Sequence, residues 1–179
     1  MVWGSTFIIL MMLFSSWSWA ESNIQKLETD YGKIFIPEYK DWEMGRDMYG
    51  MPFIYFSPQV NSQRSNISFT YTGVDLKVNL AEMGQDPKGY QELKNSWAQS
   101  VDAKPLEYKT YKSWKNLHGH TVHEVGFDYL FKEKKYAEMS YYVDCRGQLV
   151  YAKSLRLHVN NDHAPLMHKL VSELDCGAK

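Results

Sequence analysis

The segment from His118 to Glu124 carries the densest group of side chains that could do chemistry, with three imidazoles and one carboxylate. Neutral imidazole is the commonest metal ligand in proteins. Alternate residues of a β-strand point to opposite faces, so His118, His120 and Glu124 would share one face and His123 the other. His120 and Glu124 would stand about 13 Å apart, too far to chelate one ion together. We therefore predict no metal site and no cofactor, and we take His120 and Glu124 as candidate binding residues.

The sequence lacks the common short motifs of catalysis. It contains no Gly-x-Ser-x-Gly nucleophile motif and no glycine-rich phosphate loop. Near the last predicted loop, where Asp162 would cap a helix, there is a second group of histidines: His158, His163 and His168. We interpret these as residues of a solvated loop, and we expect Asp128 and Glu138 to be surface charges. The sequence thus predicts no catalytic residue, and we expect that the protein is not an enzyme.

The first twenty residues have the pattern of a secretory signal peptide. Met1–Ala20 contains no charged side chain, and Phe7–Phe14 is an unbroken apolar run that is too short to span a bilayer. Small residues, Ser18 and Ala20, stand where a signal peptidase would require them, which predicts cleavage before Glu21. No Lys or Arg precedes the apolar run, so an uncleaved anchor is the alternative. After cleavage we expect a soluble protein in the periplasm or outside the cell.

Two cysteines, Cys145 and Cys176, fit this oxidising destination. An even number of cysteines in an exported chain suggests a disulfide, which here would stabilise the fold by roughly 3–4 kcal/mol in the chain-entropy model. Two free thiols are the alternative. A metal pair is disfavoured because no second Cys or His lies two to four residues from either cysteine.

Composition favours one globular domain over residues 21–179. The chain has 179 residues, of which 44% are hydrophobic and 23% are charged, with 20 Lys and Arg against 21 Asp and Glu. That length is enough to bury a core without metals. The near-neutral charge argues against a nucleic-acid partner, because such binding depends on a basic surface. We expect a monomer with no membrane-spanning segment after signal cleavage.

Hydrophobic periodicity predicts a chain of strands with two helices. A helix should begin at Asp86-Pro87, bury a face made of Tyr90, Leu93, Trp97 and Val101, and end at Lys104-Pro105. A second helix should span 164–174, with Gly177 as its stop signal. Strands are predicted over residues 31–36, 52–57, 66–72, 106–114, 121–131, 136–143 and 149–159, with Trp42 in a turn region. The final helix must run back toward the turn at residues 144–147 if it packs on the same sheet, which would bring the two cysteines together.

Tyrosine is abundant, with 13 residues in the chain. Tyrosine supplies a large, rigid contact area and is enriched at interfaces. We therefore add Tyr136, Tyr142 and Tyr151 to the candidate binding residues. The alternative is ordinary sheet packing, because aromatic residues favour strands in any case.

The order of these elements resembles the PsbP-like fold, which is also used by bacterial DcrB-like envelope proteins and by a eukaryotic Ran-binding import factor. The resemblance spans about residues 28 to 174 and rests on packing and turn positions. These are Ile36-Pro37 with Trp42, Gly119-His120 with Glu124 and Phe127-Asp128-Tyr129, Tyr141-Tyr142-Val143 with Gly147 and Tyr151, and the final amphipathic helix. It implies an α+β fold in which a mostly antiparallel sheet is packed between helices, an α/β/α sandwich, and a non-enzymatic role in binding or assembly. The lipid-accepting cysteine of many DcrB-like proteins is absent.

Three functions fit these observations. The leading hypothesis is an exported, non-catalytic envelope protein that binds a protein or a small ligand. The first alternative is an inhibitor or immunity-type protein that blocks one partner enzyme. The second is a metal-dependent envelope hydrolase that uses His120, His123 and Glu124.

Overall fold

The structure is a computed structural model, and it describes residues 24–29, 32–60, 62–72, 80–160 and 162–177. The predicted signal peptide, residues 1–20, lies outside the described residues.

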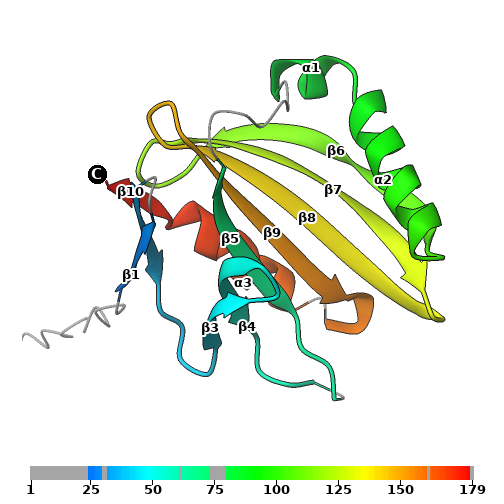
Figure 1. Ribbon diagram of the computed structural model, residues 1–179, viewed down its shortest axis with the longest axis horizontal. Helices are drawn as coiled ribbons and strands as arrows, with labels where there is room; N and C mark the ends of the chain where they lie inside the picture. The colour runs from blue at the N-terminus through cyan, green and yellow to red at the C-terminus, as the bar shows by residue number, and fades with distance from the viewer. Residues whose placement is uncertain (1–23, 30–31, 61, 73–79, 161, 178–179) are drawn as a thin grey trace, which may run out of the picture.

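A seven-stranded antiparallel sheet forms the middle layer of the molecule (Figure 1). Its strand order is β3-β4-β5-β9-β8-β7-β6. The strands are β3 (Glu43–Met48), β4 (Met51–Phe56), β5 (Asn66–Thr72), β6 (Lys104–Lys115), β7 (Thr121–Phe131), β8 (Lys134–Asp144) and β9 (Leu149–Leu157). The hairpin β7–β8 pairs without a break from Thr121↔Asp144 to Phe131↔Lys134. Its two turn residues, Lys132 and Glu133, both have positive φ, which matches the twist of a two-residue hairpin.

A second, three-stranded sheet lies at one end of the large one. Its order is β1-β2-β10, formed by β1 (Ile24–Thr29), β2 (Gly32–Pro37) and β10 (Asp175–Gly177). The first and last strands of the described chain thus join the same small sheet. Gly177 therefore lies in a strand and does not end the last helix as predicted.

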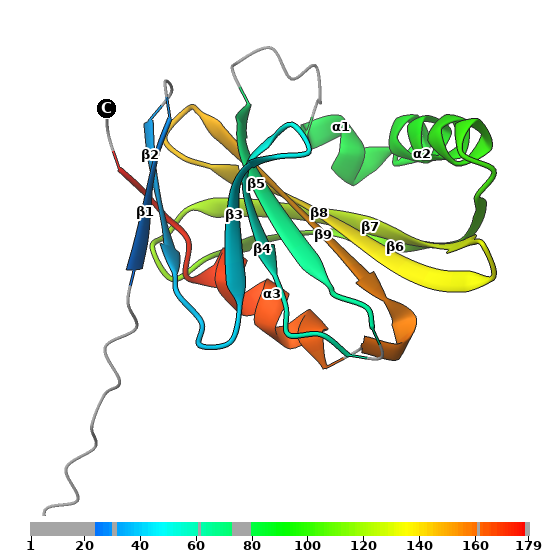
Figure 2. The same ribbon diagram turned by 60° about the horizontal axis from the view of Figure 1, so that its bottom comes forward.

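Helices cover both faces of the large sheet (Figure 2). The helices α1 (Leu80–Gln85) and α2 (Lys88–Ser100) lie on one face, and α3 (His163–Ser172) lies on the other. A short 3₁₀ turn, η1 (His158–Asn160), follows β9, which ends two residues earlier than predicted. These layers confirm the predicted α+β class with a mostly antiparallel sheet between helices.

The buried face of α2 differs from the predicted one. Tyr90 and Ala98 are buried, whereas Leu93 and Val101 are exposed. The buried face is displaced from the predicted one because Lys94 also packs inward against the sheet. Lys94 lies on the same side of the helix as Tyr90 and Ala98.

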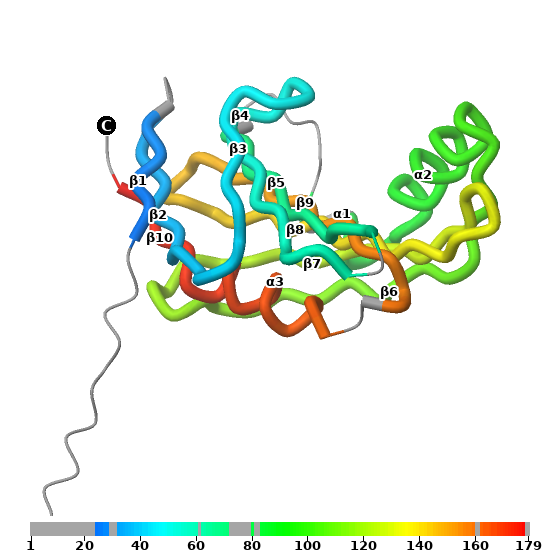
Figure 3. The backbone as a smooth tube through the Cα atoms, turned by 90° about the horizontal axis from the view of Figure 1, so that it is seen from below, coloured from blue at the N-terminus to red at the C-terminus, as the bar shows by residue number. Residues whose placement is uncertain are grey.

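Two apolar cores lie on the two sides of the large sheet. The larger one is between the sheet and α3, where Met167, Leu170 and Val171 meet Ile67 and Phe69 of β5. The smaller one lies between the sheet and the helices α1 and α2, and its buried members are Met83, Tyr90, Val125 and Tyr142. Figure 3 shows the backbone course of both helices.

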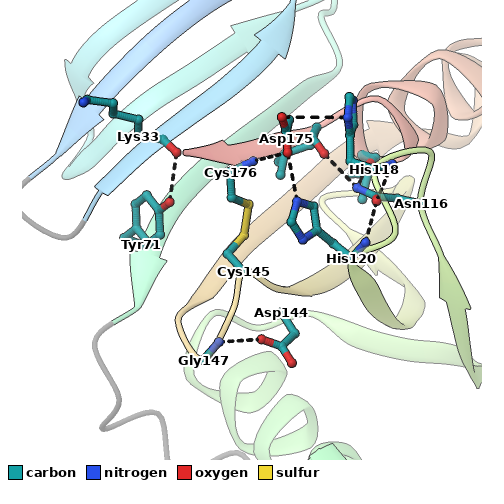
Figure 4. Close-up of a disulfide and its surroundings, with 12 residues drawn as sticks. Lys33, Tyr71, Asn116, His118, His120, Asp144, Cys145, Gly147, Asp175 and Cys176 are labelled. Atoms are coloured by element: carbon teal, nitrogen blue, oxygen red, sulfur yellow. Dashed lines mark hydrogen bonds and ion pairs between the residues drawn. A yellow bond between two sulfur atoms is a disulfide. The ribbon is translucent and has the colours of Figure 1, made fainter. Parts of the chain in front are cut away.

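The predicted disulfide between Cys145 and Cys176 is present (Figure 4). It connects the β8–β9 turn of the large sheet to β10 of the small sheet, with the two Cα atoms 5.7 Å apart. The last helix does run back toward this turn, as its packing on the sheet required. The bond therefore fixes one sheet against the other.

Candidate functional site

The turn between β6 and β7 is fastened to the end of α3 by the buried side chain of Asn116. Its amide nitrogen donates to the carbonyl oxygen of Leu174 at 2.7 Å, and its oxygen accepts from the backbone N–H groups of His118 and His120 at 3.0 Å each. The backbone N–H of Leu117 also donates to Ser172 at 3.0 Å. Carbonyl groups at a helix end need such partners, so Asn116 serves both the turn and the helix.

Asp175 joins this turn to β10. Its Oδ1 lies 2.9 Å from Nε2 of His120, and its Oδ2 lies 3.8 Å from Nδ1 of His118 (Figure 4). Burial alone would raise the carboxyl pKa of Asp175. The hydrogen bonds from His120 and from the Cys176 N–H, with the charges of both histidines, outweigh burial and lower that pKa. His120 thus holds β10 in place beside the disulfide.

An open groove of about 450 Å³ lies beside these residues, between the small sheet, the β6–β7 turn and the end of α3. Its apolar lining residues are Ile24, Phe35, Pro37 and Leu117. The rest of the lining is formed by His118 and by an acidic part, Glu173 and Asp175. Ile24 and Leu117 are exposed by 64% and 75%, although both are apolar. A groove of this volume falls in the range of ligand-binding clefts.

Glu124 lies elsewhere, on the face of the large sheet that α3 covers. Its Oε2 accepts from the indole N–H of Trp114 at 3.1 Å and lies 3.8 Å from Nδ1 of His168 in α3. It lines a smaller cavity of about 210 Å³ between the sheet and the helix. Glu124 therefore lines a different hollow from the groove, which His120 borders only through its hydrogen bond to Asp175.

His123 points to the opposite face, as the strand alternation predicts. Its Nδ1 lies 2.5 Å from the hydroxyl of Tyr111, and burial lowers its pKa. The structure thus does not bring together His120, His123 and Glu124, the set that the metal-dependent hydrolase would need. Within the described residues, no group of three or more His, Cys, Asp or Glu side chains is placed to hold a metal ion.

The three candidate tyrosines lie on the α2 face of the sheet and pack there. Tyr142 is buried in the smaller core, 5.0 Å from the ring of Tyr151, and Tyr136 stacks on Tyr129 at 5.4 Å between ring centroids. Burial, helped by the charge of Glu138, raises the pKa of Tyr142 to about 12. The structure therefore shows these tyrosines in ordinary sheet packing. A binding role for them stays a prediction.

Asp128 and Glu138 are buried, so the expectation of surface charges was wrong. Asp128 accepts from Lys109 at 3.2 Å and lies 3.3 Å from Lys135, while Glu138 pairs with Lys94 of α2. A carboxylate can be buried when a cation accompanies it. The cations come from β6, β8 and α2, and the positions of these elements could not be read from the local pattern.

The histidines of the last loop have separate partners. Nε2 of His158 lies 3.2 Å from Asp128, and Nδ1 of His163 lies 3.0 Å from the hydroxyl of Ser65. His168 packs against the ring of Trp114. Asp162 does stand at the N-cap of α3, but its side chain makes no capping hydrogen bond. The structure therefore forms no common site from them.

Sequence comparison finds no matching protein family and no matching curated protein. The solved structures that share the architecture include the following two. LpqN of Mycobacterium tuberculosis, described as involved in cell envelope biogenesis, has a TM-score of 0.60 and 15% identity, over 88% of this chain and 92% of that one. The cyanobacterial PsbP of Synechocystis sp. PCC 6803, CyanoP, has a TM-score of 0.57 and 11% identity, over 92% of this chain and 98% of that one.

These likenesses concern the fold, since both identities are low. A relationship to DcrB-like proteins stays a prediction. The sandwich of helices around a mostly antiparallel sheet, together with its match to CyanoP over most of both chains, shows that this protein has the PsbP-like fold.

Proposed function

We propose that the protein is an exported, non-catalytic binding protein of the cell envelope, and that its groove receives an apolar segment of a partner protein. One observation carries this proposal. Ile24 and Leu117 expose most of their apolar surface beside a groove of about 450 Å³. Exposed apolar surface at a concave site is typical of a place where another molecule docks.

The groove is rigid, which favours binding. Asn116 and the disulfide hold its two walls, so little conformational freedom is lost when a partner docks. Its acidic part, Glu173 and Asp175, matches a partner segment that carries a lysine or arginine next to its apolar residues.

Three further observations support an envelope location: two concern the chain itself, and one concerns a protein that shares its fold. The first twenty residues have the pattern of a signal peptide, and the disulfide suits an oxidising compartment. LpqN, which shares the fold, is described as acting in cell envelope biogenesis. Among the described residues, no helix is both long and apolar enough to cross a membrane.

The test is site-specific photo-crosslinking in the cells that make the protein. A photoreactive residue replaces Leu117 in one variant and Val159 in the other. Val159 is a matched control because it is apolar, 74% exposed and outside the groove lining. We expect one defined partner adduct at position 117 and none at position 159.

Charge substitution then checks that the adduct depends on the groove. Ile24→Asp should abolish the adduct at position 117, whereas Leu93→Asp should not, because both residues are 64% exposed and only Ile24 lines the groove. The same adduct at both positions, or an adduct that survives Ile24→Asp, would contradict the proposal. If the captured partner is an enzyme and the protein inhibits it, the function is that of an inhibitor and not a role in assembly.

A further inference from the structure

Three buried carboxylates lie on β7 and β8, and the fold balances their charges differently. Glu138 pairs with Lys94 from α2. Asp128 lies within 3.3 Å of both Lys109 and Lys135. Each of these two carboxylates therefore has a lysine supplied by the chain, as buried charges require.

Glu124 is the exception. Within the described part of the chain, no lysine or arginine forms an ion pair with it; its contacts are the Trp114 indole at 3.1 Å and His168 at 3.8 Å. A buried carboxylate without a close cation is costly. A cationic group bound beside Glu124 would offset that cost.

The space for such a group exists. The cavity of about 210 Å³ that Glu124 lines has a floor of buried residues, which include Tyr141, Ser154 and Met167. His168, which is exposed, stands at its edge on α3. The cavity is thus closed by the sheet and borders solvent at His168.

A second charge of opposite sign lines the same cavity. Arg156 of β9 shares a face of the sheet with Glu124, since Glu124 pairs with Tyr141 of β8, and Ala137 of β8 pairs with Arg156. The register separates the two by two side-chain rows, about 13 Å along the strands. β8 lies between β7 and β9, so the two residues are also about 10 Å apart across the strands. Both long side chains line the cavity, and a ligand that bridges them would lie over β8.

We propose that this cavity binds a small zwitterion of the α-amino-acid type, with its ammonium group at Glu124 and its carboxylate at Arg156. A guanidinium has five N–H donors, so Arg156 can serve a ligand carboxylate alongside its contacts within the protein. The hydroxyls of Tyr141 and Ser154 add polar contacts at the floor. This site is separate from the groove and does not depend on the partner proposed for it.

The volume limits the ligand. A cavity of 210 Å³ corresponds to about seven water-sized groups. Clefts for larger organic ligands start at about 300 Å³. The site therefore fits a small amino acid and excludes a peptide or a nucleotide.

The experiment is isothermal titration calorimetry of the disulfide-bonded protein with glycine, L-alanine, L-serine and L-valine, each used separately. Each amino acid that binds is compared with the amine that lacks its carboxylate and with the acid that lacks its ammonium group. We expect at least one amino acid to bind with a Kd below about 1 mM, and both counterparts to bind at least about tenfold more weakly. Failure of all four amino acids, or equal binding by an amine or an acid, overturns the proposal.

Variants locate the site. Glu124→Gln and Arg156→Gln should each weaken binding about tenfold or more. The matched controls Glu92→Gln and Arg146→Gln remove the same charges from exposed positions outside the cavity and should leave the affinity unchanged. Unchanged affinity in both cavity variants overturns the proposal. Should either cavity variant fail to fold, the comparison of amino acid, amine and acid on the unaltered protein decides alone.

Discussion

Glu124 and Glu138 are both buried glutamates, but they lie on opposite faces of the large sheet and have different surroundings. On the α2 face, Lys94 pairs with Glu138 and also lies 5.3 Å from the ring centroid of Phe127. On the α3 face, Glu124 meets an indole N–H and a more distant imidazole, and a cavity opens next to it.

The difference separates a structural charge from one that is available to a ligand. The Lys94–Glu138 pair is neutral as a unit and is enclosed by aromatic rings, so it leaves nothing for a further molecule to satisfy. Glu124 lies next to open space. Both faces of the sheet hold helices, and the proposed ligand site lies on the α3 face.

The largest expected effect tests the closed face. Glu138→Gln leaves the Lys94 ammonium buried without its counter-charge, so the free energy of unfolding should fall by about 3–5 kcal/mol. Urea denaturation followed by circular dichroism measures it. The double variant Lys94→Met/Glu138→Leu should recover most of this loss, because it removes both charges. A loss below about 1 kcal/mol in the single variant would show that the pair is not structural.

Removing the disulfide should affect the α3 side more than the α2 side. The variant Cys145→Ala/Cys176→Ala should lose roughly 3–4 kcal/mol of stability, since the loop that the bond closes becomes free in the unfolded chain. Amide hydrogen exchange should rise in β2 and β10 and stay unchanged in α2. Equal deprotection of α2 would mean that the two faces unfold as one unit.

Glu124→Gln should have a small effect on stability, about 1 kcal/mol or less. The glutamine oxygen still accepts from Trp114, and no lysine or arginine ion pair among the described residues is broken. The same urea titration measures the change. A loss as large as that of Glu138→Gln would remove the distinction between the two faces.

The smallest expected effect is a pH dependence on the α2 face. Burial lowers the pKa of His123, with Lys115 contributing and Asp144 opposing, so protonation favours the unfolded chain. The stability that neutral His123 contributes is complete above its unfolded pKa of about 6.5 and is lost as the pH falls through the lowered pKa. Between about pH 8 and about pH 5, the melting temperature should therefore fall more in the unaltered protein than in His123→Gln. Identical pH dependence in both proteins would exclude this contribution.

The sequence predicted the elements whose residues have a strong local pattern. The β7–β8 hairpin alternates clearly on both sides of a charged tip. The strand β7 has the predicted bounds, and β8 begins two residues before and ends one residue after its predicted range of 136–143. The proximity of the cysteines followed from the direction of the last strand and helix. The strand β3, with the sequence EMGRDM, has no β-branched or aromatic residue and was not predicted, and its first residues fall in the turn region expected around Trp42. It forms because β4 pairs with it, and a local pattern contains no information on such a partner.

The two hollows were only partly predictable. Glu124 and His120 were candidates because of their residue types, and each does lie in or beside a hollow. Arg156, Asp175 and Glu173 were missed. They come from distant strands and the end of α3, and only the register of the sheets brings them to these places.

The pairing of β2 with β10 also sets the order in which the chain can fold. A ribosome makes proteins from the N-terminus, so β2 emerges long before Cys176, which pairs with Ile34 of that strand. Closing such a long loop is entropically costly, and contacts of this kind form late. The groove beside the small sheet therefore forms only after all seven strands of the large sheet have been made, and the proposed docking surface appears at that stage.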